Sequence, residues 1–207
     1  MKHIVLVGLA LLIATPAYSQ VVRVGVHAVG VDHSEINDAR RVVGGGVGGL
    51  LSVRIGRFGL DVSGHMASLD SADGGGDAFK VLQGDVRLNV LLARGFAIEV
   101  GGGRRAIDPD FAATEVGLGR VGILSELPIS SAGGFWGRAA YLVAPQFDGG
   151  GDAGLAFEVG FGAGFGTRNG RFRVRVEYEF QRIDRKVNLS EVPIQVSVGK
   201  LGLDVGF

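Results

Sequence analysis

The stretch Arg171–Phe180, RFRVRVEYEF, alternates strictly between charged residues and large apolar ones. Successive side chains of a β-strand point to opposite faces, so this stretch has one apolar face and one charged face. A soluble sandwich would turn the apolar face toward its core and the charges toward water. A membrane barrel would turn the apolar face toward lipid and the charges into its lumen. The rest of the chain decides between these two arrangements.

The N-terminus has the form of a secretory signal peptide. Lys2 supplies a positive charge, an apolar run follows from Ile4 to Ala14, and small residues lead up to Ser19 and Gln20. The apolar run is too short to cross about 30 Å of hydrocarbon as a helix. The sequence therefore predicts a signal peptide over 1–19, cleavage between Ser19 and Gln20, and one mature domain over 20–207.

The composition narrows the class of protein. The chain has 37 glycines among 207 residues, no cysteine, and 21 basic residues against 21 acidic ones. Interior glycine costs about 1 kcal/mol relative to alanine in a helix, so this content argues against helices. Without cysteine there are no disulfides or thiolate metal sites, which suits passage through an oxidising periplasm. The neutral balance gives no reason to expect a nucleic-acid partner, and we expect no metal and no cofactor.

Alternation like that of the opening stretch recurs along the whole mature chain. It predicts ten strands, or eight if the sixth and seventh segments do not form strands. The polar faces carry Arg, Glu, Asp and Gln, which a small dry core could not satisfy, so the apolar faces are expected to meet lipid. The predicted strands are Val22–Gly30, Val43–Ile55, Phe58–Met66, Leu82–Leu92, Phe96–Arg105, Thr114–Leu127, Gly134–Gln146, Leu155–Thr167, Arg171–Arg182 and Val192–Phe207.

The connections between these strands alternate in length. Short ones fall at 56–57, 94–95, 128–133 and 168–170, and longer ones at 31–41, 70–78, 107–113, 147–153 and 183–191. Short turns at one end and longer loops at the other are typical of a closed antiparallel up-and-down transmembrane barrel. A closed ring of strands also leaves no unpaired edge in the bilayer.

Two strands break the regular alternation. In the last strand, the apolar residues up to Val198 and those from Leu201 onward lie on opposite parities, which predicts a β-bulge near Gly199 and Lys200. In the sixth strand, the apolar phase changes around Arg120. Both features are interpreted as local changes in which side chains face lipid.

The signal peptide, the dyad repeat and the terminal LGLDVGF resemble the outer-membrane β-barrel family of Gram-negative bacteria, in its small OmpA-like or opacity-type branch. The resemblance implies a monomer surrounded by outer-membrane lipid. Few aromatic residues are available for the membrane interface, among them Trp136, Tyr141 and Tyr178. In this family a C-terminal aromatic preceded by alternating apolar residues is read by the barrel-assembly machinery. The matching residues here are Leu201, Leu203, Val205 and Phe207.

The charged faces are expected to fill the lumen with ion pairs, because ten strands enclose little more space than the eight whose interior side chains already fill. For the charges of the opening stretch, the expected partners are Glu158 on the preceding strand and Lys200 or Asp204 on the following one. The predicted lumen network comprises Arg23, Arg54, Asp61, Asp85, Arg87, Glu99, Arg138, Glu158, Arg173, Arg175, Glu177, Glu179, Lys200 and Asp204.

These features favour a non-enzymatic barrel with a structural or surface-interaction role through five external loops. The alternative is a narrow channel for small solutes or ions. A more distant alternative is a hydrolase similar to the omptin proteases, which use paired carboxylates with an Asp-His couple. Candidate components are Asp32 and His33 in the first long loop and Asp70 and Asp73 in the second. The sequence does not identify an external ligand.

Overall fold

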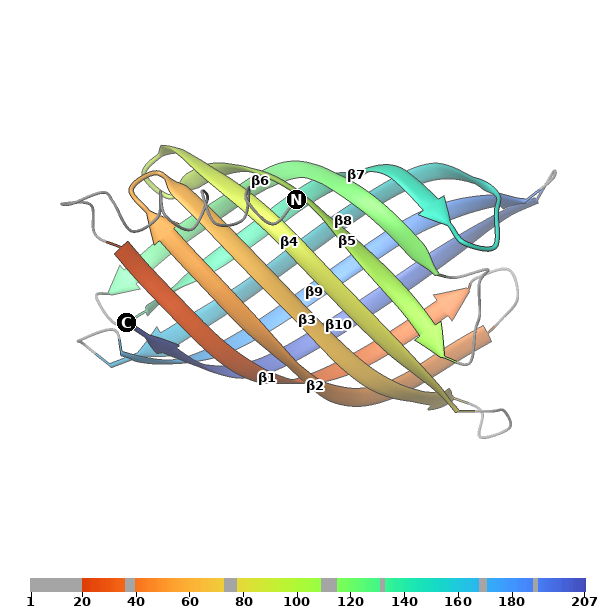
Figure 1. Ribbon diagram of the computed structural model, residues 1–207, viewed down its shortest axis with the longest axis horizontal. Helices are drawn as coiled ribbons and strands as arrows, with labels where there is room; N and C mark the ends of the chain where they lie inside the picture. Colours follow the sequence, from red (N-terminus) through yellow and green to blue (C-terminus); the bar gives the residue numbers. More distant parts are fainter. Residues whose placement is uncertain are drawn as a thin grey trace, which may run out of the picture.

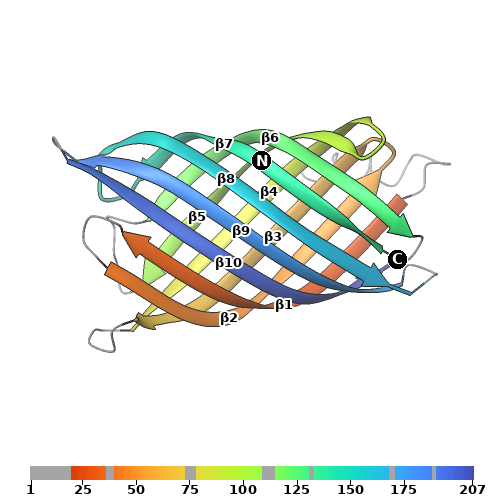
Figure 2. The same cartoon turned by 180° about the vertical axis from the view of Figure 1, so that it is seen from behind.

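The computed structural model describes residues 20–35, 40–72, 78–108, 115–130, 133–167, 171–187 and 190–207. They form one closed antiparallel barrel in which each strand pairs with its neighbours in sequence and β10 pairs with β1 (Figures 1 and 2). This confirms ten strands and excludes eight. Within these ranges no helix is long and apolar enough to cross a membrane. The strands are β1 (Gln20–Glu35), β2 (Arg40–Ile55), β3 (Phe58–Ser71), β4 (Phe79–Ala93), β5 (Phe96–Asp108), β6 (Val116–Ser130), β7 (Gly133–Phe147), β8 (Asp152–Gly166), β9 (Phe172–Val187) and β10 (Ser190–Gly206).

The barrel closes between its first and last strands. β1 and β10 pair continuously from Arg23 with Gly206 to Glu35 with Ile194. The backbone N–H of Phe207 extends this pairing by donating to the carbonyl of Val22 at 2.9 Å. No edge strand is left unpaired, as a sheet in hydrocarbon requires. The predicted signal peptide and the predicted turn at 168–170 lie outside the described residues.

The two ends of the barrel differ in their connections. Gly56 and Gly95, with φ angles of 58° and 75°, provide the positive φ of the tight turns that join β2 to β3 and β4 to β5. We call this end, where β1 begins and β10 finishes, the turn end, and the opposite end the loop end (Figure 1). The termini of the barrel domain therefore share one end.

The outer wall is an apolar belt. In β9, Val174 and Val176 are 50% and 56% exposed, whereas Glu177 and Glu179 are buried in the interior. Val26 on β1 and Leu201 on β10 continue the same outward row, because they lie on the outward parity of paired strands. The apolar side chains of this strand therefore cover the outside of the barrel and its charged side chains lie inside, as in a transmembrane barrel.

The predicted bulge in β10 and the phase change in β6 are both wrong. β10 pairs residue by residue with β9 and β1 through Gly199 and Lys200, and β6 pairs without interruption with β5 around Arg120. The parity changes in neither of these two strands, although β7 has a register shift near Ala144, where the inward row passes from Leu142 to Phe147. Instead, the apolar residues Ile194, Val196 and Val198 point into the lumen, where they are 2–4% exposed. The inward face itself changes from polar to apolar along the strand.

Connections at the loop end are shorter than predicted. β1 continues to Glu35 and β2 begins at Arg40, while β9 continues to Val187 and β10 begins at Ser190. The predicted loops at 31–41 and 183–191 are therefore mostly strand. The inward apolar side chains explain this result, because they pack in the interior and keep the sheet regular beyond the outward belt. Only positions 36–39 and 188–189 therefore separate the strands at these two connections.

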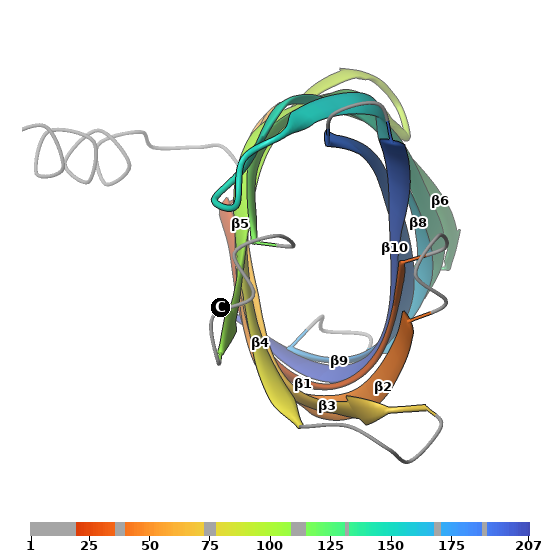
Figure 3. The same ribbon diagram turned by 90° about the vertical axis from the view of Figure 1, so that its right-hand side faces the viewer.

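The barrel is oval rather than round when viewed from the loop end (Figure 3). Glycines on the inward face accompany the close approach of neighbouring strands. At Gly44 and Gly46 on β2, a Cβ atom would collide with the backbone of Ser68 and Met66 on β3. Opposite walls of an oval ring lie close together across its short axis. Long side chains from one wall can therefore reach the other.

The orientation of β9, with apolar side chains toward lipid and charged ones toward the lumen, can be tested by a pair of substitutions. Val176→Arg places a charge in lipid, which costs about 2–4 kcal/mol near the bilayer midplane. Arg175→Gln removes a charge from the inward face and should reduce the folded fraction much less. The measurement is the amount of folded, heat-modifiable barrel in vesicles and its free energy of unfolding. A larger loss for Arg175→Gln would mean that the charged face meets lipid.

Candidate functional site

A guanidinium group from β4 joins opposite walls of the lumen. Arg87 Nη2 donates to Glu158 Oε1 on β8 at 3.0 Å and to Glu179 Oε1 on β9 at 2.9 Å. Its Nε lies 3.8 Å from Glu99 on β5. All four side chains are at most 6% exposed. Three strands separate β4 from β8 on one route around the ring and five on the other, so this contact crosses the lumen.

Further buried charges complete a layer around Arg87. Lys200 on β10 donates to Glu179 at 2.6 Å and to Glu177 at 3.2 Å. Arg120 on β6 pairs with Asp85 and Arg138 on β7 lies 3.6 Å from Glu179. We call this set the ionic layer: Asp85, Arg87, Glu99, Arg120, Arg138, Glu158, Glu177, Glu179 and Lys200.

The ionic layer holds four cations against five carboxylates. An isolated buried charge costs several kcal/mol in desolvation, so each member depends on its partners. Removing one member therefore exposes the others to that cost. The layer is held by ion pairs more than by complete hydrogen bonding, since both carboxylate oxygens of Glu99 lack a hydrogen bond within the described residues. Such a network makes the interior rigid and leaves little room for a continuous water path.

Apolar side chains fill the lumen on the loop side of the ionic layer. Every strand contributes at least one of them, and all are between 0% and 7% exposed. In β1 they follow His27 on the same parity, and in β10 they precede Lys200. We call this cluster the apolar plug: Val29, Val31, Val42, Ala67, Leu69, Val81, Ile107, Val116, Leu142, Phe147, Ala156, Ile183, Ile194, Val196 and Val198.

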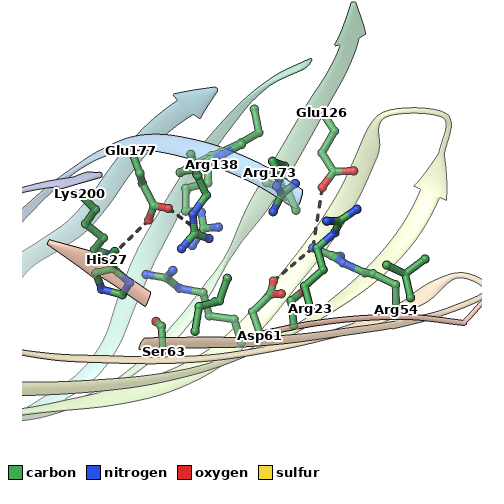
Figure 4. A pocket seen from close by; sticks show the side chains of 17 residues that line it. Arg23, His27, Arg54, Asp61, Ser63, Glu126, Arg138, Arg173, Glu177 and Lys200 are labelled. Carbon is green, nitrogen blue, oxygen red and sulfur yellow. Dashed lines mark hydrogen bonds and ion pairs between the residues drawn. The ribbon is translucent and has the colours of Figure 1, made fainter. Parts of the chain in front are cut away.

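A cavity of about 280 Å³ lies on the turn side of the ionic layer (Figure 4). Its walls come from residues near the turn-end limits of the strands, such as Arg23 on β1 and Trp136 on β7. Arg54 and Glu126 on its rim keep 35% and 52% of their side-chain surface exposed, so solvent reaches the cavity from this end. We call it the vestibule.

Cations dominate the vestibule. Seven of the lining side chains are Arg or Lys and three are Asp or Glu. Arg54 pairs with Asp61 at 3.2 Å, and Arg173 donates to the fully buried Asp204 at 2.8 Å. The cationic lining residues are Arg23, Arg54, Arg87, Arg138, Arg173, Arg175 and Lys200, and the acidic ones are Asp61, Glu126 and Glu177.

Trp136 lies inside the barrel and not in an interfacial girdle, contrary to the sequence-based expectation. Its ring lines the vestibule, and the Arg138 guanidinium lies 4.7 Å from the ring centroid. The two residues share the inward parity of β7, which explains their contact. Tyr141 and Tyr178 do face outward, with exposures of 55% and 38%.

The structure places all of the charged residues assigned to the lumen on the inward face of the barrel. Of the partners expected for the opening stretch, Lys200 contacts Glu177 and Glu179, and Asp204 accepts from Arg173. Glu158 instead contacts Arg87 across the lumen and Arg120 on β6, two strands away. Sequence analysis missed Arg120, which is 1% exposed, although its even spacing from Leu118 and Leu124 was a signal of inward parity.

The residues considered for a hydrolase site do not lie together in the part of the chain that the structure describes. Asp32 pairs with Arg41 through Nη2 at 2.6 Å, and its neighbour His33 points to the opposite, inward face, where it is 4% exposed. Asp70 lies on the outward parity of β3. Asp73 lies outside the described residues. An acid/base pair needs its members within hydrogen-bond reach of one reacting group, which adjacent residues on opposite faces do not provide.

Comparisons with known proteins show the fold and no closer relationship. No protein-family model and no curated protein matches the sequence. Among solved structures, the outer membrane protease OmpT from Escherichia coli is similar over 94% of this chain and 99% of its own, with 10% identity and a TM-score of 0.53. Neisserial surface protein A covers 90% and 97%, with 13% identity and a TM-score of 0.47. The chain therefore has the fold of outer-membrane β-barrels.

The dependence of the ionic layer on Arg87 can be tested by stability measurements. Arg87→Met should leave three buried carboxylates without their shared partner and cost about 3–5 kcal/mol. The control is Arg104→Met, because Arg104 is 65% exposed and its pair with Asp148 should contribute about 1 kcal/mol or less. Urea unfolding in phospholipid vesicles, followed by Trp136 fluorescence, gives both values. Equal losses would show that the ionic layer does not depend on Arg87.

Proposed function

We propose that this chain is an integral outer-membrane barrel that is closed to solute flow and has a structural or surface-contact role. The observation that supports the proposal best is the double filling of the lumen. The ionic layer crosses it, and the apolar plug then occupies its loop-end half. A hydrated ion would have to displace both the buried ion pairs and close-packed apolar side chains, which oppose it for different physical reasons.

The proposed orientation follows from the barrel's connections and termini. In bacterial outer-membrane barrels the short turns face the periplasm. Gln20 and Phe207 lie at the turn end of this barrel, together with the tight turns at Gly56 and Gly95. The vestibule then opens to the periplasm, and the small loops above the apolar plug face the exterior. These loops form the surface available for external contacts.

An enzymatic role receives less support than a structural one. OmpT is a protease, but its 10% identity to this chain carries only the fold. The outward Asp32 and Asp70 and the inward His33 belong to different surfaces. The channel alternative also receives less support, because the apolar plug packs the loop-end half of the lumen, where Arg105 is buried against Gln181. We therefore favour a non-enzymatic barrel.

Closure of the lumen can be tested in planar lipid bilayers. Purified protein should insert without producing stable conductance steps, because the ionic layer and the apolar plug block ion passage. A general porin reconstituted under the same conditions serves as the positive control. Insertion is verified independently by protease protection of the barrel in vesicles. Reproducible, ion-selective steps from the inserted protein would overturn the proposal in favour of a channel.

The terminal residues are proposed as the assembly signal. Leu201, Leu203 and Phe207 point outward and are 59%, 47% and 80% exposed, so a recognition partner can reach them. Phe207→Ala keeps the backbone bonds to Val22 but removes the ring. It should lower outer-membrane levels severalfold while leaving refolding in detergent intact.

The control for this experiment is Phe172→Ala, which removes an outward aromatic ring of 51% exposure from the same end of the barrel. Its outer-membrane level should stay close to that of the wild type. Equal membrane levels for wild type and Phe207→Ala would remove the reason to treat the terminus as a signal. Equal losses for both variants would point to general interfacial anchoring instead.

A further inference from the structure

We propose that the vestibule is a binding site for a small organic oxyanion, with a phosphate group as the best match. Nothing in the closed lumen requires a solvent-accessible cavity with so many cations at its turn end. Three of its seven basic side chains, those of Arg87, Arg138 and Lys200, also face carboxylates of the ionic layer, which leaves four basic side chains against Asp61 and Glu126. A phosphate monoester carries a charge of about −1.5 to −2 at neutral pH and would offset much of this excess.

The basic side chains of the vestibule differ in how closely they approach carboxylates. Arg54 and Arg173 have carboxylate partners at 3.2 Å and 2.8 Å. Arg138 and Arg175 do not approach carboxylates as closely. The nearest carboxylate oxygens lie 3.6 Å from Arg138 Nη1 and 3.7 Å from Arg175 Nη1, beyond direct hydrogen-bond distance.

Several donors that line the vestibule lack hydrogen bonds within the described part of the chain. They are Nε and Nη1 of Arg138, Nε of Arg87 and of Arg175, and the one N–H of a neutral His27, both of whose ring nitrogens lack a partner and which is 4% exposed. Buried donors are normally satisfied, so such a group in one cavity indicates a missing partner. Figure 4 shows Arg138 and His27 on the same side of the vestibule, beside Glu177 and Lys200.

The chemistry of these donors indicates the ligand class. Guanidinium groups present parallel N–H donors that match phosphate and carboxylate oxygens bidentately. The lining also contains apolar side chains, including Leu50, Leu124 and Trp136. A volume of about 280 Å³ admits a phosphate or carboxylate group with a few attached carbon atoms. The site thus fits a small organic anion better than a bare halide.

The closed loop end determines the direction from which such a ligand arrives. The ionic layer forms the inner limit of the vestibule, because Arg87, Glu177 and Lys200 belong to both. A ligand enters and leaves through the turn end, which is the periplasmic end in the proposed orientation. The vestibule is a blind binding site and does not form part of a transport path.

Trp136 provides a local probe for the test, since it is the only tryptophan of the chain and lines the vestibule. Purified full-length barrel in a zwitterionic detergent is titrated with inorganic phosphate and with glycerol 3-phosphate while Trp136 fluorescence is recorded. Glycerol and sodium chloride at matched ionic strength are the reference titrations. We expect a saturable change with both phosphate compounds and no saturable change with either reference.

Matched variants locate the site. Arg138→Gln and Arg175→Gln should each raise the dissociation constant for glycerol 3-phosphate about tenfold or more, as expected for the loss of one charge-assisted contact. Arg57→Gln, an exposed substitution in the turn between β2 and β3, should leave it unchanged. Heat-modifiability on gels verifies that each variant is folded.

Three results would overturn the inference. They are the absence of a saturable signal with the phosphate compounds, an equal response to sodium chloride, and an Arg57→Gln effect as large as that of Arg175→Gln. Saturation by inorganic phosphate and glycerol 3-phosphate with equal constants would support an oxyanion site and assign no role to the apolar wall. Because binding is measured in detergent without a conductance readout, its failure leaves the closed-lumen proposal standing, and conductance would leave the binding result standing.

Discussion

The contact of Arg87 with carboxylates on the far wall is the interaction on which the interior depends. One guanidinium group from β4 joins Glu158 and Glu179, at sequence separations of 71 and 92 residues. Its reach is possible because the barrel is oval, so that opposite walls approach each other (Figure 3). Once these charges are paired and dry, the lumen on their loop side is also shielded from the turn-end solvent. Apolar side chains can then pack there as in a soluble core.

The barrel consequently has apolar surfaces of two kinds. Val174 and Val176 face outward toward lipid, while Val29 and Ile183 face inward within the apolar plug. β9 contains both, because its parity is constant and only the residue type on the inward side changes along its length. This arrangement places three zones in series along the axis: the vestibule, the ionic layer and the apolar plug.

The sequence predicts the wall of the barrel better than its contents. Strict alternation in β9 and tight turns at Gly56 and Gly95 were sufficient for the strand count and for the lipid-facing side. The inward apolar residues Ile194 and Val198 were misinterpreted as evidence of a bulge. That error arose because apolar side chains were assumed to face lipid everywhere, whereas in the loop-end half they have a dry interior as a second place to pack.

The cross-lumen contacts of Arg87 could not be read from sequence, because they depend on the oval shape and on the relative shear of strands far apart in the chain. Trp136 is different, since its shared parity with the charged Arg138 already indicated an inward position. A similar argument applied to Arg120. The position of a residue in the alternation of its strand is therefore a stronger guide to whether its side chain faces inward than the residue type.

Charge is distributed unevenly along the barrel axis, because the ionic layer is dry and the vestibule is open to solvent. In the dry ionic layer, four cations face five carboxylates, because an unbalanced charge there would bear the full desolvation cost. The vestibule is open to solvent through Arg54 and Glu126, so it tolerates an excess of cations that the interior could not. Arg87, Arg138 and Lys200 also face carboxylates of the ionic layer, so the excess comes from the remaining four lining cations. This excess thus lies in the part of the lumen that is open to solvent at the turn end.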